Sequence, residues 1–342
     1  MSAADYRSFA EDWELRATIR TRPRRLLEDD NNLIFPLCRQ PLVLTATFLE
    51  QCPQWRDFVL VQTFYKFIND VVIFETEIVD KTARSIAKNR FSVPFPFACR
   101  YNAMTVVIDE DYHALVALDF MQQTIEMTGI LPLELPTQIE LSVAIPVALG
   151  LAPEHLRDAV ELICVAIAEN TVTQDVAAFS KDDSVKQSIK GLMADHLFDE
   201  GRHAGFWARL VRSYWLTASE EDRTTIAQIL PIFLQHYLTN NLQKSFDLQL
   251  IEHLDVSTDT GAAVQKLRQR ASPAHHPGRY GRPVRQRSET AATGYGPPCR
   301  VGCPARLWTF ARCRLFLANT HGPRLSGVRP ARAGLAGVSA SL

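Results

Sequence analysis

The sequence of 342 residues lacks several features that would assign it to a common class. It has no run of about 18 uncharged apolar residues, so no transmembrane helix is expected. Its first residues lack the basic start and apolar stretch of a secretory signal. The seven cysteines are an odd number, and the four that precede residue 271 are scattered, which favours neither a disulfide framework nor a zinc site. A reduced, cytoplasmic setting away from membranes is the simplest interpretation.

Glycine is also scarce, but only in one part of the chain. Six of the 15 glycines lie in residues 1–270, whereas nine lie in residues 271–342. Because glycine weakens helix interiors, its scarcity favours long helices over residues 1–270. Residues 271–342, which hold eight of the 19 prolines, do not follow this pattern.

The formal net charge of -1 hides the same division. Residues 271–342 contain 11 arginines, no lysine and one acidic residue, whereas residues 1–270 carry 26 basic and 37 acidic side chains. The acidic body argues against non-specific binding to nucleic acid. The basic tail has the composition of an unintended reading frame or of a disordered extension, and the residues do not decide between the two.

Apolar residues at helical spacing, bounded by proline, glycine and capping residues, predict five long helical segments. We expect them at residues 56–89, 101–128, 153–178, 182–215 and 219–254, with a cap at Asp182 or Asp183 and a kink at Pro231. A short helix covers Asp12–Thr18, and a broken connection with one short helix joins the second and third segments. Two helix pairs joined by one long connection are typical of a ferritin-like bundle.

We therefore expect an all-α protein whose core is a ferritin-like four-helix bundle with extra helices. Residues 1–54 would form an N-terminal extension that packs on the bundle. Residues 55–255 would form the bundle itself, and residues 256–342 the low-complexity basic tail.

Two of the helical segments carry the same Asp-Glu-x-x-His motif, 90 residues apart. The two motifs are Asp109-Glu110-Asp111-Tyr112-His113 and Asp199-Glu200-Gly201-Arg202-His203. A Glu and a His three residues apart lie about 60° apart around a helix, so both side chains point to the same side. His196, one turn before Glu200, extends the second motif into a stripe about two turns long.

The first and third segments each place one glutamate on an apolar face. Glu75 has isoleucine and valine around it at helical spacing, and Glu169 has leucine, valine and alanine. The neighbouring Glu77 has charged residues at the same offsets and is expected to be solvated. Because an ionised glutamate is costly to bury alone, each of these glutamates taken singly would favour an interface ion pair.

Taken together, four glutamates and three histidines follow the order of a dinuclear carboxylate centre inside a bundle. Seven such groups meeting in a core would repel one another unless cations lay between them. Carboxylate and imidazole ligands suit two iron ions, or manganese. The predicted metal ligands are Glu75, Glu110, His113, Glu169, His196, Glu200 and His203.

This ligand pattern resembles that of the di-iron arylamine N-oxygenase family, over roughly residues 55–255. The additional His196 distinguishes that family from ferritins, ribonucleotide reductase small subunits and soluble methane monooxygenases. The resemblance also implies a homodimer, because members of the family tend to form one.

The resemblance implies a role for each ligand. Glu75 and His113 would bind one iron, and Glu169, His196 and His203 would bind the other. Glu110 and Glu200 would bridge the two ions and so stand closest to the chemistry. Asp109 and Asp199, each preceding a bridging glutamate, are placed to accept hydrogen bonds from ligand histidines and to fix their orientation.

The function implied is that of an oxidoreductase that activates O2 and transfers oxygen to an amine in small-molecule biosynthesis. The product would be a hydroxylamine or, after further rounds, a nitroso or nitro compound. No flavin or nicotinamide fingerprint is visible, so a separate ferredoxin or reductase is expected as electron donor. No arginine lies beside Glu75 to receive a benzoate-type carboxylate, which leaves aliphatic and carrier-bound amines open as substrates.

Two alternatives stay open at this point. The first keeps the two irons but changes the reaction to hydroxylation or desaturation at carbon. The second, of a different class, is an iron-binding helical bundle without catalysis.

Overall fold

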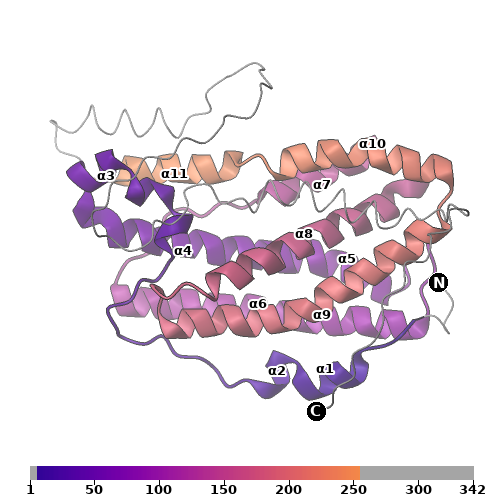
Figure 1. Ribbon diagram of the computed structural model, residues 1–342, viewed down its shortest axis with the longest axis horizontal. Helices are drawn as coiled ribbons and strands as arrows, with labels where there is room; N and C mark the ends of the chain where they lie inside the picture. The colour runs from indigo at the N-terminus through magenta and orange to yellow at the C-terminus, as the bar shows by residue number, and fades with distance from the viewer. Residues whose placement is uncertain (1–5, 255–342) are drawn as a thin grey trace, which may run out of the picture.

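The computed structural model describes residues 6–254, and these residues are helical apart from their connections (Figure 1). Within this part of the chain no β-strand forms, and the nearest approach is an isolated bridge between Leu33 and Val185. The predicted basic tail at residues 256–342 lies outside the described residues.

Four long helices form the bundle and run lengthwise through the molecule (Figure 1). The first is continuous over α4 (Arg56–Ile73), η4 (Phe74–Val79) and α5 (Asp80–Ala87), and the others are α6 (Phe97–Thr128), α8 (Arg157–Phe179) and α9 (Gln187–Thr217). The first helix packs on α6, α8 packs on α9, and α6 contacts α9. This arrangement confirms the all-α, ferritin-like bundle expected from the sequence.

Shorter helices cover the bundle on two sides. They are α1 (Ala10–Arg16), α2 (Thr18–Thr21), η1 (Leu37–Arg39), η2 (Pro41–Leu44), α3 (Ala46–Gln51), η3 (Pro53–Trp55), α7 (Glu140–Leu151), η5 (Glu154–Leu156), α10 (Glu220–Tyr237) and α11 (Asn241–His253). In Figure 1, α10 and α11 lie along the upper side, and α1 and α2 lie along the lower side below α6 and α9. The short helix expected between residues 129 and 153 is α7.

The last predicted segment is two helices rather than one kinked helix. α10 continues through Pro231, and the chain breaks between Tyr237 and Asn241 instead. A proline inside a helix removes one backbone hydrogen bond, but here the surrounding apolar residues hold the helix together. Ile226, Leu230 and Phe233 of α10 are all buried.

The predicted start of α9 at Asp182 or Asp183 is also wrong. Asp182 instead accepts hydrogen bonds from the backbone and hydroxyl of Ser184 and so closes a turn, at 3.0 and 2.6 Å. α9 begins at Gln187, and the N–H of Ser188 donates to Glu28 at 2.8 Å. The helix end is therefore satisfied by a carboxylate from far away in the sequence, which a local capping pattern does not reveal.

Two apolar clusters lie on either side of the bundle centre. The first includes Val79, Ile163 and Phe233, and the second includes Phe64 and Phe246. Burying side chains of this size contributes about 1.5–3 kcal/mol each. The polar residues that lie between the two clusters are therefore surrounded by tightly packed apolar side chains.

One stretch, Glu154–Phe179, is long and apolar enough to cross a membrane by length and composition. It contains α8, one of the four bundle helices, and 56% of its most apolar window is buried inside the protein. Packing in the bundle core accounts for its apolar character.

We predict that Gly129→Ala destabilises the fold by about 1 kcal/mol. Gly129 ends α6 with a φ of +67°, a left-handed conformation that strains a residue with a side chain. Gly150→Ala, in α7 with no atom within 4 Å of an added Cβ, is the matched control and should be neutral or stabilising by up to about 0.5 kcal/mol. Urea denaturation measures both, and equal effects of the two changes would contradict the prediction.

Candidate metal centre

The seven side chains predicted as metal ligands meet at the centre of the bundle. All are buried, and the most exposed of them, His113, is 6% exposed. They form two groups, Glu75 with His113 and His196, and Glu110 with Glu169, Glu200 and His203, and within each group the ligand atoms lie within 4.8 Å of one another. The neighbouring Glu77 is exposed, as predicted.

The position of His196 differs from the one that the resemblance implied. His196 Nε2 lies 3.1 Å from Glu75 Oε1, in the group with His113 rather than with Glu169 and His203. His196 and His203 are seven residues apart on α9, so they stand about 10 Å apart along the helix axis. Their ring nitrogens converge nevertheless, because His196 Nε2 and His203 Nδ1 lie 3.3 and 3.2 Å from the same atom, Glu200 Oε1. His196 stacks on His113, with ring centroids 4.3 Å apart.

Glu75 lies in η4, a π-helical turn inside the first long helix. A π turn holds one more residue than an α turn and rotates the following helix by about 100° relative to the preceding one. Ile68 before the turn and Val79 after it are consequently both buried, in different apolar clusters. The turn thus lets Glu75 point to the bundle centre while both halves of the helix keep an apolar face inside.

Glu110 and Glu200 occupy the middle of the cluster. The two oxygens of Glu110 face different histidines, with Oε2 3.2 Å from His113 Nδ1 and Oε1 2.9 Å from His203 Nδ1. Glu200 Oε1 lies 3.2 Å from His203 Nδ1 and 3.3 Å from His196 Nε2. Each of these two carboxylates contacts members of both groups, which is the position that a bridging ligand requires.

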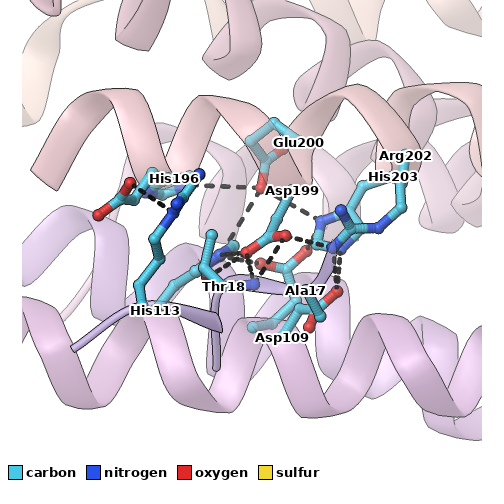
Figure 2. A network of polar contacts seen from close by, with 12 residues as sticks. Ala17, Thr18, Asp109, His113, His196, Asp199, Glu200, Arg202 and His203 are labelled. Atoms are coloured by element: carbon cyan, nitrogen blue, oxygen red, sulfur yellow. Dashed lines mark hydrogen bonds and ion pairs between the residues drawn. The ribbon is translucent and has the colours of Figure 1, made fainter. Parts of the chain in front are cut away.

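Asp109 and Asp199 contact the far side of two of the histidines (Figure 2). His203 Nε2 lies 3.1 Å from Asp109 Oδ2, and His113 Nε2 lies 3.2 Å from Asp199 Oδ2. Each aspartate therefore contacts the histidine of the opposite helix. Because a carboxylate can only accept, it fixes the hydrogen on Nε2 and leaves Nδ1, which faces the glutamates, available to a metal.

Residues 10–28, which we call the N-terminal strap, lie across α6 and α9 outside this cluster. Arg24 Nη2 lies 2.7 Å from Asp119 Oδ1 on α6, and Arg25 Nε lies 2.6 Å from Asp195 Oδ2 on α9. These two ion pairs attach the strap to both of the helices that carry the Asp-Glu-x-x-His motifs.

The strap also supplies donors to the two aspartates. Trp13 Nε1 donates to Asp109 Oδ1 at 2.8 Å. The hydroxyl and the backbone N–H of Thr18 both donate to Asp199 (Figure 2). Arg202 of α9 donates to both carboxylates and links them. The strap is therefore part of the network that orients the histidines.

Glu169 has a partner of its own on α9. Trp207 Nε1 donates to Glu169 Oε1 at 3.0 Å, whereas Glu169 Oε2 has no hydrogen-bond donor among the described residues. The indole therefore fixes which oxygen of Glu169 faces the other ligands. No sequence pattern pointed to the roles of Trp13, Thr18, Arg202 or Trp207, because a hydrogen-bond partner distant in sequence leaves no periodic signal.

A cavity of about 340 Å³ lies between the strap and the bundle and reaches the cluster. His113 and His196 line it, together with apolar residues such as Phe67 and Leu192, and Arg22 of the strap. A second cavity, of about 640 Å³, lies between α4 and α8. Two of the seven predicted ligands line the first cavity, whereas none of the seven lines the second.

The charges of the cluster are not balanced by the protein. Six carboxylates, the four glutamates and the two aspartates, meet one guanidinium, that of Arg202, and three imidazoles. Burial raises the pKa of the Glu75 carboxyl to about 6 despite the opposing effect of His196. Burial and the nearby His113 would lower the pKa of His196, but Glu75 and Glu200 outweigh them and raise it to about 9.

The remaining groups respond to the same surroundings. Burial and the carboxylates of Glu200 and Glu110 raise the pKa of Glu169 well above its usual value. Burial would lower the pKa of His203, but Glu110 and Glu200 raise it well above the usual value. Without bound metal ions, the raised pKa values of these groups therefore favour protonation, which compensates part of the negative charge of the carboxylates.

Several buried atoms of the cluster also lack a hydrogen-bond partner among the described residues. They are Glu75 Oε2, Glu169 Oε2 and Glu200 Oε2. Buried polar atoms are rarely left unpaired, because each costs about 1–3 kcal/mol. Carboxylate oxygens and imidazole nitrogens that converge without donors fit divalent cations of the first transition series.

Comparison with known families agrees with this geometry. The model of the family described as P-aminobenzoate N-oxygenase AurF matches residues 9–275, about three quarters of the chain. The chain belongs to the AurF family. The match confirms the resemblance seen in the ligand pattern, and it begins at residue 9 rather than near residue 55. Trp13, Thr18 and the rest of the strap thus fall within the part that matches the AurF family.

A curated relative is the 4-aminobenzoate N-oxygenase of Streptomyces thioluteus. It is 24% identical over 212 residues, which cover 61% of this chain and 61% of the relative. The chain thus matches about three fifths of the length of that relative.

We predict that Thr18→Val weakens binding of ferrous iron roughly 2- to 10-fold, less than the 10- to 100-fold usual for losing the histidine's own partner, because Asp199 remains. The change removes the hydroxyl that donates to Asp199 and so loosens His113. Competition with a chelator measures the affinity. Thr18→Ser keeps the hydroxyl and should bind iron like the unmodified protein; equal losses in both variants would show that the hydroxyl is not responsible.

We further predict that Gly191→Ala weakens the ion pair between Arg25 and Asp195, which helps to attach the strap, at a cost of up to about 1 kcal/mol. An added Cβ at position 191 would lie 2.5 Å from Arg25 Nη1 and 2.7 Å from its Cζ, so the guanidinium must move. Limited digestion with trypsin should then cleave after Arg24 or Arg25 faster than in the unmodified protein. Gly201→Ala, on the same helix with open space around the added Cβ, should leave the rate unchanged.

Proposed function

We propose that this chain is a di-iron oxygenase that transfers oxygen to the nitrogen of an amine. The product is a hydroxylamine, and further rounds of the same reaction give nitroso or nitro compounds. Membership of the AurF family supports the proposal, as does the similarity to a protein named as an N-oxygenase.

The observation that carries the proposal is the pair of ligand groups at the bundle centre. Storage of iron or a structural role would not call for seven buried, convergent ligand residues with hydrogen-bonded partners behind them. Glu75, His113 and His196 would hold one ion, and Glu169 and His203 the other. Glu110 and Glu200 would contact both.

The bound irons would supply the activation of O2, and the protein residues set the conditions for it. Asp109 and Asp199 hold the hydrogens of His203 and His113 on Nε2, so that each Nδ1 keeps its lone pair for the metal. Trp207 fixes one oxygen of Glu169. The apolar clusters on both sides keep water away from the reacting groups.

The reaction has a defined balance. One oxygen atom of O2 is inserted into an N–H bond of the amine to form the N–OH group, and the other leaves as water. This requires two electrons and two protons from outside. Because the sequence shows no flavin or nicotinamide fingerprint, we propose a separate ferredoxin or reductase as their source, in a homodimeric, cytoplasmic enzyme.

The cavity of about 640 Å³ has the size expected for a small-molecule site. Val71 and Phe74, which line it, precede Glu75, and Val172 follows Glu169 by one turn. This apolar end suits an aromatic or aliphatic group, and we propose that the amine binds here, beside Glu75 and Glu169 in the chain although neither side chain lines the cavity. Lys66 and Asp70 also line the cavity and form an ion pair there, with Lys66 Nζ 2.5 Å from Asp70 Oδ2.

We predict about two irons per chain, and loss of at least one of them in Glu110→Ala. That change removes a carboxylate that faces both His113 and His203. Iron is measured by metal analysis of the purified protein. Glu77→Gln, which removes a charge from the exposed side of the same bundle, is the control and should keep both irons.

Activity is then tested with the ferrous protein, O2, a chemical reductant and a panel of aromatic and aliphatic amines. A mass gain of oxygen on nitrogen is the expected result. Oxygen found on carbon alone would favour a hydroxylase or desaturase instead. A stably folded chain that binds no iron would refute the proposal.

A further inference from the structure

The N-terminal strap is rich in arginine, in contrast to the acidic body around it. Five arginines fall within ten residues of the strap, whereas residues 1–270 as a whole carry a net charge of -11. The five are Arg16, Arg20, Arg22, Arg24 and Arg25. Their side chains are between 37% and 65% exposed, so the charge is presented to solvent.

These guanidinium groups outnumber the carboxylates that pair with them. Arg22 and Arg25 share one partner, Asp195, at 3.3 and 2.6 Å. The other three arginines each have one acidic partner, so five cations meet four anions. Because a guanidinium has five N–H donors, each of these pairs leaves donors for an incoming carboxylate.

This arginine face lies directly over the metal centre. Thr18 lies between Arg16 and Arg20 in the strap, is 2% exposed and donates its hydroxyl to Asp199. Asp199 in turn contacts His113 Nε2 at 3.2 Å. Two hydrogen bonds thus connect the strap to a predicted metal ligand (Figure 2).

A second connection runs parallel to the first. Arg20 lies over the ring of Trp13, with Cζ 5.6 Å from the ring centroid. Trp13 Nε1 donates to Asp109, which contacts His203 Nε2 at 3.1 Å. The exposed arginines of the strap therefore lie on the same side of the bundle as His113 and His203, the two histidines whose Nε2 atoms contact Asp199 and Asp109.

We propose that this arginine face is the docking surface for the electron donor, and that the donor is a small acidic iron–sulfur protein of the ferredoxin type. The inference rests on the proposed function, because the oxygenation consumes two electrons that the chain does not supply. Each reduced donor would dock, give up one electron and leave oxidised. Two such transfers provide the two electrons of one round.

Charge complementarity favours this partner over others. Weak redox complexes use small interfaces in which opposite charges raise the rate of encounter. A strongly polyanionic partner such as nucleic acid would be repelled by the acidic remainder of residues 1–270. A small protein with a single acidic patch can bind the arginine face without bringing that patch near the acidic surface of the rest of the chain.

The test measures binding of a plant-type [2Fe–2S] ferredoxin to the iron-loaded protein by calorimetry at low ionic strength. The double variant Arg16→Gln/Arg22→Gln should raise the Kd at least fivefold. Arg16 pairs within the strap and Arg22 forms the longer of the two pairs with Asp195, so Arg24 and Arg25 still attach the strap to α6 and α9 in this variant. In the unmodified protein, the Kd should rise at least tenfold between 20 and 300 mM NaCl, as expected for exposed charges.

The matched control is Arg56→Gln/Arg90→Gln, which removes the same charge from exposed positions outside the strap. Its Kd should stay within twofold of that of the unmodified protein. An equal effect of the two double variants, no effect of either, or no binding of ferredoxin to the unmodified protein would overturn the proposal. If the strap variant does not fold, the salt dependence of ferredoxin binding to the unmodified protein still tests the proposal, because a Kd that does not change with NaCl concentration would contradict it.

A reduction assay separates this inference from the proposed function. Dithionite, a small reductant that needs no docking surface, should reduce the ferric centre of all variants at the same rate. Ferredoxin should reduce the strap variant at least fivefold more slowly. Amine oxidation by protein that has been reduced with dithionite, freed of the excess and then given O2 tests the proposed function alone, so its failure would leave the measured ferredoxin affinities as an independent result.

Discussion

The structure depends on one electrostatic constraint, which is that six carboxylates are buried between two apolar clusters. Each ionised carboxylate would be costly there without compensation, and the described residues supply one guanidinium and three imidazoles. Without metal ions the deficit appears as displaced pKa values, with the pKa of His196 raised to about 9 and that of Glu169 raised well above its usual value. With neutral imidazoles, two divalent cations would offset four of the five excess negative charges and would also pair the atoms that lack donors. The site is therefore built for cations, and the helices around it are arranged to keep it dry.

This constraint explains features that stability alone would not favour. A π turn at Glu75 departs from regular helix geometry, but it directs the carboxylate inward while both flanking faces stay apolar. The crossed contacts of Asp109 with His203 and of Asp199 with His113 tie α6 to α9 at the point where like charges would push them apart. Arg202 spans the two aspartates and reduces the repulsion between them. Rigidity and charge compensation are thus provided by the same residues.

The sequence predicted what is periodic and local. The four long helices and the seven predicted ligands followed from apolar spacing and from Glu-x-x-His on one helix face, and the structure brings the seven side chains together. The π turn, the start of α9 and the group that His196 joins could not be predicted, because each depends on contacts between distant segments. The strap shows the limit most clearly. Trp13 and Asp109 are 96 residues apart, and nothing near Trp13 in the sequence marks it as a partner of the metal centre.

The composition of the strap follows from the two tasks that its position imposes. It must cover a buried cluster, which favours apolar contact, and it must face solvent. Arginine meets both demands, because its planar guanidinium is weakly hydrated and stacks on aromatic rings while it keeps its charge. Arg20 lies 5.6 Å from the ring centroid of Trp13, and Arg22 lies 5.9 Å from that of Phe198. Lysine would keep the charge but lose the stacking, and leucine would keep the packing but lose the charge. A segment that both closes the centre and carries a positive face therefore has to be rich in arginine, even in an acidic body.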